Sequence, residues 1–147
     1  MKALKTAVIA LLVYAGIVTL FESTIGYLQP SQPGSTIQIT TFDAEGKPHD
    51  RVVSKLVTDG KTYVAANHWP RAWYHRVLEN PRVQVAVDGQ KVEYRAVPVS
   101  GAEHARVQSE HPHGLVFLFL TGFPPRHFVR LDPVSAAASS LPAEPTP

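Results

Sequence analysis

The stretch at residues 62–81 reads T-Y-V-A-A-N-H-W-P-R-A-W-Y-H-R-V-L-E-N-P, a pattern that predicts a strand followed by a short helix. Its first five residues are β-branched, aromatic or small and follow the turn pair Asp59-Gly60, a pattern that predicts a strand. Pro70 suits the first turn of a helix, and Pro81 ends that helix. Between the prolines, four apolar side chains share one helical face: Trp73, Tyr74, Val77 and Leu78. A strand therefore leads directly into the N-terminus of a short helix.

The junction between this strand and this helix is a candidate anion site. Asn67, His68 and Arg71 lie there, near the free N–H groups and the positive dipole end of the helix. Arg71 would oppose the dipole unless an anion lay between them, so we expect Arg71 and Arg51 to clamp a phosphate. The alternative is that the aromatic side chains are core residues and the arginines are merely solvated.

Residues 72–89, A-W-Y-H-R-V-L-E-N-P-R-V-Q-V-A-V-D-G, carry a resemblance to one family. They resemble the signature P-x-W-Y-x-N-L-x-A-N-P-x-V-x-V-x-x-G of the deazaflavin-dependent nitroreductases, also called deazaflavin-dependent quinone reductases. The similarity extends over residues 36–133, by order and spacing more than by identity outside the W-Y…N-P-x-V-x-V core. The resemblance implies a small split β-barrel and an oxidoreductase that uses a deazaflavin coenzyme of the F-420 type.

The resemblance also implies where that coenzyme binds. In the family it lies against three segments, which correspond here to residues 49–54, 65–68 and 72–76. Small side chains would let the flat ring approach the backbone, aromatic side chains would wall it, and arginines would contact its phosphate. The implied cofactor-binding residues are Arg51, Ser54, Ala65, Ala66, Asn67, His68, Arg71, Trp73, Tyr74 and Arg76.

Tyr74 and His75 are the expected catalytic side chains. We expect the Tyr74 hydroxyl to contact the ligand and Trp73 to be mainly structural, packing on the barrel. The chain has no cysteine, no G-x-S-x-G and no glycine-rich phosphate loop. A cofactor enzyme needs none of these motifs, because the cofactor performs the hydride chemistry and the protein binds and orients it.

One loop departs from the family pattern. Members usually carry the basic loop T-T-G-R-x-S/T-G-x-x-R, whereas this chain has T-T-F-D-A-E-G-K-P-H at residues 40–49. Asp43 and Glu45 would repel the polyanionic tail of a deazaflavin coenzyme. Two alternatives are therefore open: the same barrel using FMN, and a non-catalytic binding module around Trp69 and Trp73.

Composition fits one globular domain and excludes several classes of site. The 147 residues are 44% hydrophobic, enough for a real core. The formal net charge of +2 and the lack of a basic cluster interleaved with aromatics argue against nucleic acid as a partner. Without cysteine there is no disulfide and no thiolate metal site. His111 and His113 lack a third ligand nearby in sequence, so no metal site is predicted.

Residues 1–28 are predicted to be a membrane anchor. Residues 6–21 are uncharged and mostly apolar, with Lys2 and Lys5 before them and Glu22 after them. A cleaved signal peptide is the rival interpretation, but no small-x-small cleavage site follows. The positive-inside rule places the N-terminus in the cytoplasm and the globular domain on the outer, periplasmic side. A bilayer anchor suits a quinone or another hydrophobic acceptor.

The remaining chain divides into a linker (29–35), the barrel domain (36–133) and a disordered tail (134–147). Asp59-Gly60 and Asp88-Gly89 predict two-residue hairpins. We therefore expect a mainly β protein with helices (α+β): an antiparallel split β-barrel of about six strands, preceded by one transmembrane helix. The sequence leaves a homodimer open.

Two further elements are expected before the last strand. Ser100 and Glu103 have the spacing of a capping box, which predicts a helix to about Glu110. The run G-L-V-F-L-F-L-T-G, residues 114–122, is too short to span a bilayer and is expected to be a buried helix or strand. Residues 127–131 alternate and are expected to supply the last barrel strand.

Overall fold

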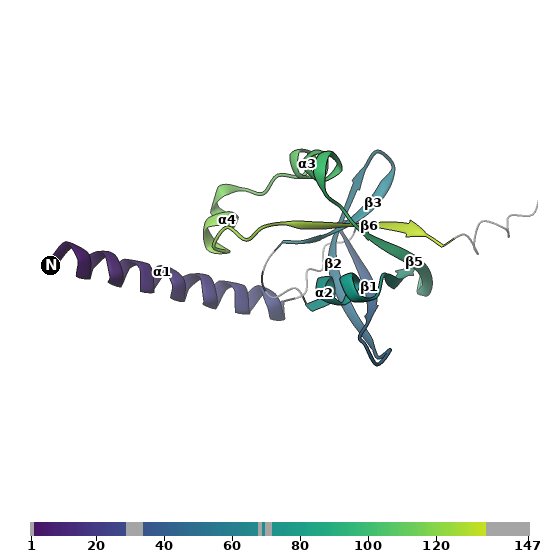
Figure 1. The fold of residues 1–147 in the computed structure, drawn as a ribbon, viewed down its shortest axis with the longest axis horizontal. Coiled ribbons are helices and arrows are strands. Elements are labelled where there is room, and N and C mark those ends of the chain that lie inside the picture. Colours follow the sequence, from purple (N-terminus) through teal and green to yellow (C-terminus); the bar gives the residue numbers. More distant parts are fainter. Residues whose placement is uncertain (1, 29–33, 68, 70–71, 135–147) are drawn as a thin grey trace, which may run out of the picture.

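The computed structural model describes residues 2–28, 34–67, 69 and 72–134. Six antiparallel strands form a closed barrel in the order β1-β2-β3-β6-β5-β4, which confirms the predicted fold class (Figure 1). The strands are β1 (Thr36–Phe42), β2 (Pro48–Thr58), β3 (Lys61–Ala66), β4 (Arg82–Val87), β5 (Gln90–Pro98) and β6 (His127–Pro133). The helices are α1 (Lys2–Tyr27), α2 (Ala72–Glu79), α3 (Gly101–Glu110) and α4 (Leu115–Leu120).

The two Asp-Gly pairs form the predicted hairpin turns. Asp59 and Gly60 have φ values of 49° and 71°, and Asp88 and Gly89 have values of 48° and 79°. Two successive residues at positive φ form the turn whose twist matches that of paired strands. The first pair joins β2 to β3 and the second joins β4 to β5.

Barrel closure depends on pairings between strands far apart in sequence. β1 pairs with β4, and β6 inserts between β3 and β5. The strands enclose an apolar core that includes Ile39, Val53, Val64, Val83, Val85, Val129 and Leu131. Trp73 and Val77 of α2, one helical turn apart, belong to the same core. Leu78, at the edge of the predicted apolar face, points about 100° away from Val77 and is 51% exposed.

The predicted capping box at the start of α3 is wrong. Ser100 is the N-cap residue, but its side chain makes no capping hydrogen bond. The Glu103 carboxylate instead accepts hydrogen bonds from the Tyr63 hydroxyl (2.8 Å) and from Arg130 Nη1 (2.8 Å). A guanidinium and a phenol together are stronger partners for this carboxylate than one backbone N–H. Glu103 therefore ties α3 to the barrel.

Replacing Glu103 with glutamine is expected to destabilise the fold in a pH-dependent way. The pKa of Glu103 lies below its usual value, chiefly because Arg130, and then Tyr63, donate hydrogen bonds to it. A lowered carboxyl pKa adds stability above the unfolded-state value, and this contribution is lost as pH falls through the folded-state value. We expect Glu103→Gln to cost about 1–2 kcal/mol at neutral pH and progressively less below about pH 4.

Denaturant titrations across that pH range would measure the difference between Glu103→Gln and the unchanged protein. Glu79→Gln, at an exposed position on α2, is the matched control and should change little at any pH. An equal cost of Glu103→Gln at neutral and acid pH would contradict the ion-pair account.

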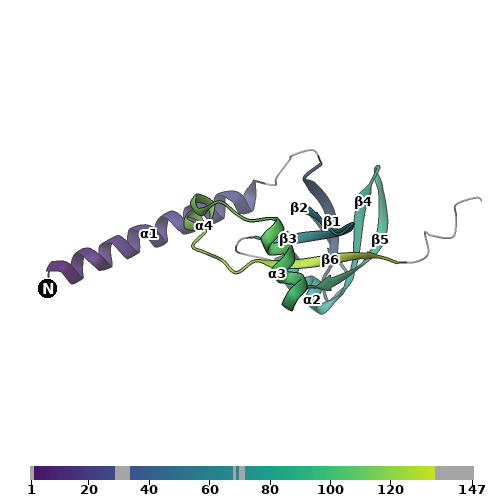
Figure 2. The ribbon, with the colours of Figure 1, turned by 90° about the horizontal axis from the view of Figure 1, so that it is seen from above.

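α4 lies beside α1 rather than inside the barrel (Figures 1 and 2). The prediction of a buried element at residues 114–122 is wrong, because α4 has no buried residue and Leu115 is 79% exposed. The apolar run packs mainly against α1: the rings of Phe117 and Phe119 contact those of Phe21 and Tyr14.

α1 is long and apolar enough to cross a membrane. Within Lys2–Ile25, a window of mean hydropathy 2.1 is 0% buried. Figure 1 shows the helix extending away from the barrel, with its C-terminal end nearest to it. Most of the predicted linker, at 29–33, and of the predicted tail, at 135–147, lies outside the described residues.

Candidate functional site

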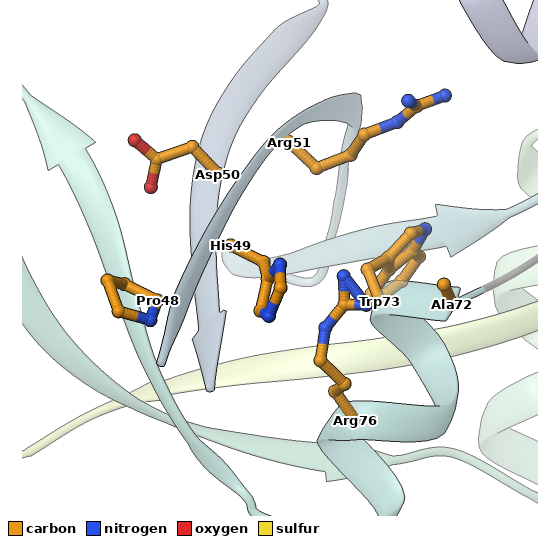
Figure 3. Close-up of a pocket in the computed structure, with 7 residues that line it drawn as sticks. All are labelled: Pro48, His49, Asp50, Arg51, Ala72, Trp73 and Arg76. Carbon is orange, nitrogen blue, oxygen red and sulfur yellow. The ribbon is translucent and has the colours of Figure 1, made fainter. Parts of the chain in front are cut away.

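A cavity of about 430 Å³ lies between β2 and α2 (Figure 3). Both elements supply its walls. The lining residues are Pro48, His49, Asp50 and Arg51 from β2, and Ala72, Trp73 and Arg76 from α2. The cavity therefore combines two guanidinium groups and an imidazole with one aromatic side chain.

The core fixes the α2 wall of this cavity. Trp73 is buried in the barrel core, so the helix cannot turn about its axis without exposing the indole. Arg76 follows three residues later, and its Nε donates to the Thr41 hydroxyl at 3.3 Å. Thr41 pairs with His49 across β1 and β2. Figure 3 shows the Arg76 side chain extending from α2 toward β2, near His49 and Trp73.

The acidic β1–β2 loop directs its aspartate inward, onto the loop itself. Asp43 Oδ1 accepts from the Lys47 N–H at 2.7 Å, and Asp43 Oδ2 lies 2.8 Å from His49 Nε2. The hydrogen bond to His49 is the largest cause that lowers the pKa of Asp43. The carboxylate therefore holds the turn together and positions His49 at the cavity, and it is not itself a lining residue.

The lining carboxylate, Asp50, is also occupied. It accepts from the Thr40 hydroxyl at 2.6 Å and from Lys91 Nζ at 2.9 Å. The Thr40 hydrogen bond, followed by the one from Lys91, lowers the pKa of Asp50. Figure 3 shows its carboxylate pointing away from Arg76 and Trp73. Two guanidinium groups and a compensated carboxylate make the lining suitable for an anionic group.

The structure brings three of the predicted cofactor residues together at the cavity: Arg51, Trp73 and Arg76. Ala65 and Ala66 are buried, and Ser54 pairs with Ala65 within the sheet. Asn67 accepts a hydrogen bond from Arg126. None of these four lines the cavity, and their predicted roles remain predictions. His68 and Arg71 lie outside the described residues, so one half of the predicted Arg51–Arg71 clamp has no described position.

The two predicted catalytic side chains lie on α2, outside the cavity lining. Tyr74 is half-buried, and its ring stacks on that of His127 with centroids 4.8 Å apart. Its hydroxyl makes no hydrogen bond to another residue that the structure describes. His75 is exposed, with its ring edge-on to Tyr74. Their catalytic roles remain predictions.

Sequence reasoning placed His49 in a coenzyme-contacting segment without naming it as a site residue, and it missed Arg126. The signal for His49 was its spacing from Asp43 across a tight turn, which we interpreted only as a loss of basic residues. Arg126 follows Pro124-Pro125 and belongs to no motif. It is buried, and its guanidinium donates to Asn67 Oδ1 (3.0 Å) and to the His111 carbonyl (2.6 Å). Burial lowers its pKa.

His111 and His113, the pair considered for metal binding, have separate surroundings. His111 Nε2 lies 3.2 Å from the Thr58 hydroxyl, whereas the His113 ring packs on Phe117. Burial, and then the charge of Arg126, lower the pKa of His113 to about 4. Among the described residues, no group of three or more histidine, cysteine or acidic side chains could hold a metal ion.

Several solved structures share this fold at low sequence identity. An F420-H2 dependent reductase, FDR-A, is 19% identical with a TM-score of 0.54, over 67% of this chain and 95% of that one. A protein described as a domain-swapped dimer is 17% identical with a TM-score of 0.54, over 69% and 82%. The heme storage protein HutZ from Vibrio cholerae is 15% identical with a TM-score of 0.50, over 80% and 87%. These likenesses establish the barrel alone.

The family comparison goes further than the fold. No curated protein matches the chain. Residues 14–113 match the model of the F420H(2)-dependent quinone reductases, which covers more than half of the 147 residues. The match confirms the resemblance found at residues 72–89, and with it the oxidoreductase class and the deazaflavin coenzyme. The chain belongs to the F420H(2)-dependent quinone reductase family.

Proposed function

We propose that the protein is a membrane-anchored reductase that passes hydride from a reduced F420-type deazaflavin to a quinone or a similar hydrophobic acceptor. The observation that carries the proposal is the β2–α2 cavity, whose lining includes Arg51, Arg76 and Trp73. These residues belong to the segments that the family resemblance assigns to coenzyme contact.

The residues at the cavity fit such a coenzyme. Its phosphate and carboxylates need cationic donors, and a guanidinium can bind such groups through two parallel hydrogen bonds. When bound, the coenzyme supplies the hydride. Arg51 and Arg76 would hold its anionic end, and the Thr41 hydroxyl positions Arg76 by accepting from Nε. On the opposite wall, Asp43 positions His49 through its hydrogen bond with Nε2.

Tyr74→Phe is expected to reduce turnover or ligand affinity while leaving the melting temperature nearly unchanged. The hydroxyl makes no hydrogen bond to the described protein, so its removal leaves no buried group unpaired. The ring stacking on His127 is retained by phenylalanine. Thermal unfolding and steady-state kinetics on the same preparation test this. If the variant equals the unchanged protein in both measurements, the ligand-facing role of Tyr74 is wrong.

α1 supports membrane anchoring, and its contacts favour a retained anchor over a cleaved signal. The Tyr14 hydroxyl donates to the Phe119 carbonyl at 2.9 Å, and Phe21 packs edge-on to Phe117. A signal peptide removed from the mature protein has no need of such contacts with the domain that remains. An anchored reductase would meet a lipid-soluble acceptor where that acceptor is concentrated.

The charge pattern around α1 supports a topology with the barrel on the outer, periplasmic side. Lys2 and Lys5 precede the apolar run, and Glu22 follows it, so the positive-inside rule keeps the N-terminus in the cytoplasm. Alkaline phosphatase fused after Pro133 is expected to be active, because it folds only outside the cytoplasm. A well-expressed but inactive fusion would reverse the assignment.

An oxidation assay tests the proposed reaction. Full-length protein in detergent should oxidise the reduced deazaflavin only when a quinone is added, and reduced FMN should not replace the coenzyme. Recovery of the oxidised coenzyme's absorption measures the rate. Tight binding of the coenzyme without quinone-dependent oxidation would show that the protein binds the coenzyme but is not a reductase. Oxidation of reduced FMN alone would assign a different coenzyme.

A further inference from the structure

An uncharged apolar segment projects from the barrel beside α1. Between His113 and Arg126 the chain reads G-L-V-F-L-F-L-T-G-F-P-P, without a charged residue. Four large side chains of this segment are half or more exposed: Leu115, Val116, Phe119 and Phe123. We call residues 114–125, which comprise α4 and the turn after it, the α4 wedge. Exposing such an apolar surface to water is unfavourable for a soluble barrel.

The α4 wedge packs along one stripe of α1. Phe117 contacts Phe21 with ring centroids 6.3 Å apart, and Phe119 contacts Tyr14 at 4.8 Å. Between these two contacts, a Cβ added at Gly122 would lie 3.0 Å from Val18 Cγ1. The wedge therefore follows α1 back from the end nearest the barrel (Figure 2).

Helix geometry gives the depth of the wedge along α1. The apolar run of α1 ends at Phe21, before the charged Glu22. Tyr14 precedes Phe21 by seven residues, or about 10 Å at about 1.5 Å per residue. The hydrocarbon core of a bilayer is about 30 Å thick. If α1 spans it, Phe119 lies well below the headgroups.

Three backbone carbonyls at this deep end are paired within the protein. The Phe117 carbonyl accepts from the Thr121 N–H, and the Leu118 carbonyl accepts from the Phe123 N–H. The Phe119 carbonyl accepts from the Gly122 N–H and from the Tyr14 hydroxyl. In hydrocarbon, an unpaired carbonyl would cost several kcal/mol, so irregular backbone there must pair internally. The carbonyls of Phe117, Leu118 and Phe119 meet that requirement.

The charged side chain that follows the wedge, Arg126, turns back into the protein. Arg126 is buried, with Nη1 on the His111 carbonyl and Nε on Asn67. α1, which contacts the wedge through Tyr14 and Phe21, also carries exposed apolar side chains, among them Leu12 and Leu20. The medium that covers these side chains of α1 therefore reaches the wedge as well.

We propose that the α4 wedge inserts into the hydrocarbon of the lipid bilayer beside α1, as a second membrane-contacting element of the chain. This inference rests on the proposed membrane anchoring by α1. A wedge next to that helix would give the barrel a second contact with the membrane and hold it against the membrane surface. The barrel then meets the bilayer through the side that carries α4.

Depth-dependent quenching in full-length protein tests this insertion. The chain has no cysteine, so a single introduced cysteine carries one fluorescent label. Labels would be placed at Leu115→Cys and Phe123→Cys in the wedge, at Leu12→Cys in α1 and at Val57→Cys on the barrel. All four positions are exposed apolar side chains, so none of the substitutions removes core packing. The protein is reconstituted in phosphatidylglycerol–phosphatidylethanolamine vesicles with spin-labelled acyl chains.

We expect acyl-chain spin labels to quench the labels at Leu12, Leu115 and Phe123, but not the label at Val57. Quenching at Leu12 alone, with both wedge labels open to aqueous iodide, would overturn the wedge proposal and leave the anchor intact. Wedge labels protected from both quenchers would mean that a second copy covers the wedge, which would also overturn it. An unquenched Leu12 would refute the anchor itself.

Discussion

Replacing Trp73 with alanine is expected to lower the free energy of unfolding by about 3–5 kcal/mol, the range for losing a buried large aromatic side chain. The indole is 8% exposed and packs in the barrel core with Val77. It also contacts Tyr74 edge-on, with ring centroids 6.0 Å apart. Alanine would leave a void between α2 and the barrel and would remove one wall of the β2–α2 cavity. Chemical denaturation in detergent, followed by circular dichroism, measures the loss.

The chain offers a matched control in its other tryptophan. Trp69 is 47% exposed, so Trp69→Ala should cost less than about 1 kcal/mol. Equal stability of the two alanine variants would contradict the structural role of Trp73. A large loss of stability in Trp69→Ala alone would mean that the anchoring aromatic side chain is Trp69, in the segment before the helix, and not Trp73.

Arg51→Ala and Arg76→Ala are each expected to weaken deazaflavin binding about ten- to a hundredfold. A charge-assisted contact to a phosphate contributes about 1.5–3 kcal/mol, which corresponds to that range of affinity. The two side chains reach the cavity from different elements, β2 and α2. Because they would contact one anionic group, the double variant should lose less than the sum of the single losses. Equilibrium titration of the coenzyme measures each affinity.

Arg106→Ala controls for the loss of a positive charge. Arg106 lies on α3 and pairs with the exposed Asp59 at 2.7 Å, outside the cavity lining. Its replacement should leave coenzyme affinity unchanged. Arg76→Lys should recover only part of the affinity, because an ammonium group cannot make the two parallel hydrogen bonds of a guanidinium. If Arg51→Ala, Arg76→Ala and Arg76→Lys all bind the coenzyme like the unchanged protein, the anionic end of the coenzyme lies elsewhere.

Local chemistry made much of the barrel predictable from sequence. A tight hairpin turn requires positive φ at two successive residues, and an Asp-Gly pair between alternating apolar residues readily adopts it. The proline-bounded run around Trp73 likewise determines α2. The insertion of β6 between β3 and β5 is different, because it depends on long-range pairing that no local pattern encodes. The family resemblance supplied the closed barrel.

Predictions failed where a distant partner decided the outcome. Glu103 had the spacing of a capping residue, yet its carboxylate accepts a hydrogen bond from Arg130, 27 positions away. The run at 114–122 was expected to be buried because apolar residues usually are, but it packs against α1 and leaves most of α4 exposed. Such competition between near and distant partners is invisible in a sequence window.

The candidate site was predictable only in part, because its side chains also depend on partners that the sequence does not show. Arg51 and Arg76 were proposed from position and charge, and they line one cavity. The acidic loop was interpreted as repulsive, because sequence does not say where a carboxylate points. In the structure, Asp43 faces the turn and His49 instead of the cavity. Arg71, the other predicted member of the phosphate clamp, lies outside the described residues.

The central claim is that the β2–α2 cavity holds the anionic end of a deazaflavin coenzyme. The most direct test compares two ligands on two proteins: the intact coenzyme and its ring fragment without the phosphate and glutamyl tail, each titrated against the unchanged protein and Arg76→Ala. We predict that the unchanged protein prefers the intact coenzyme, and that Arg76→Ala loses about ten- to a hundredfold of that preference while binding the fragment as before. A preference for the intact coenzyme that survives in full in Arg76→Ala would contradict the claim.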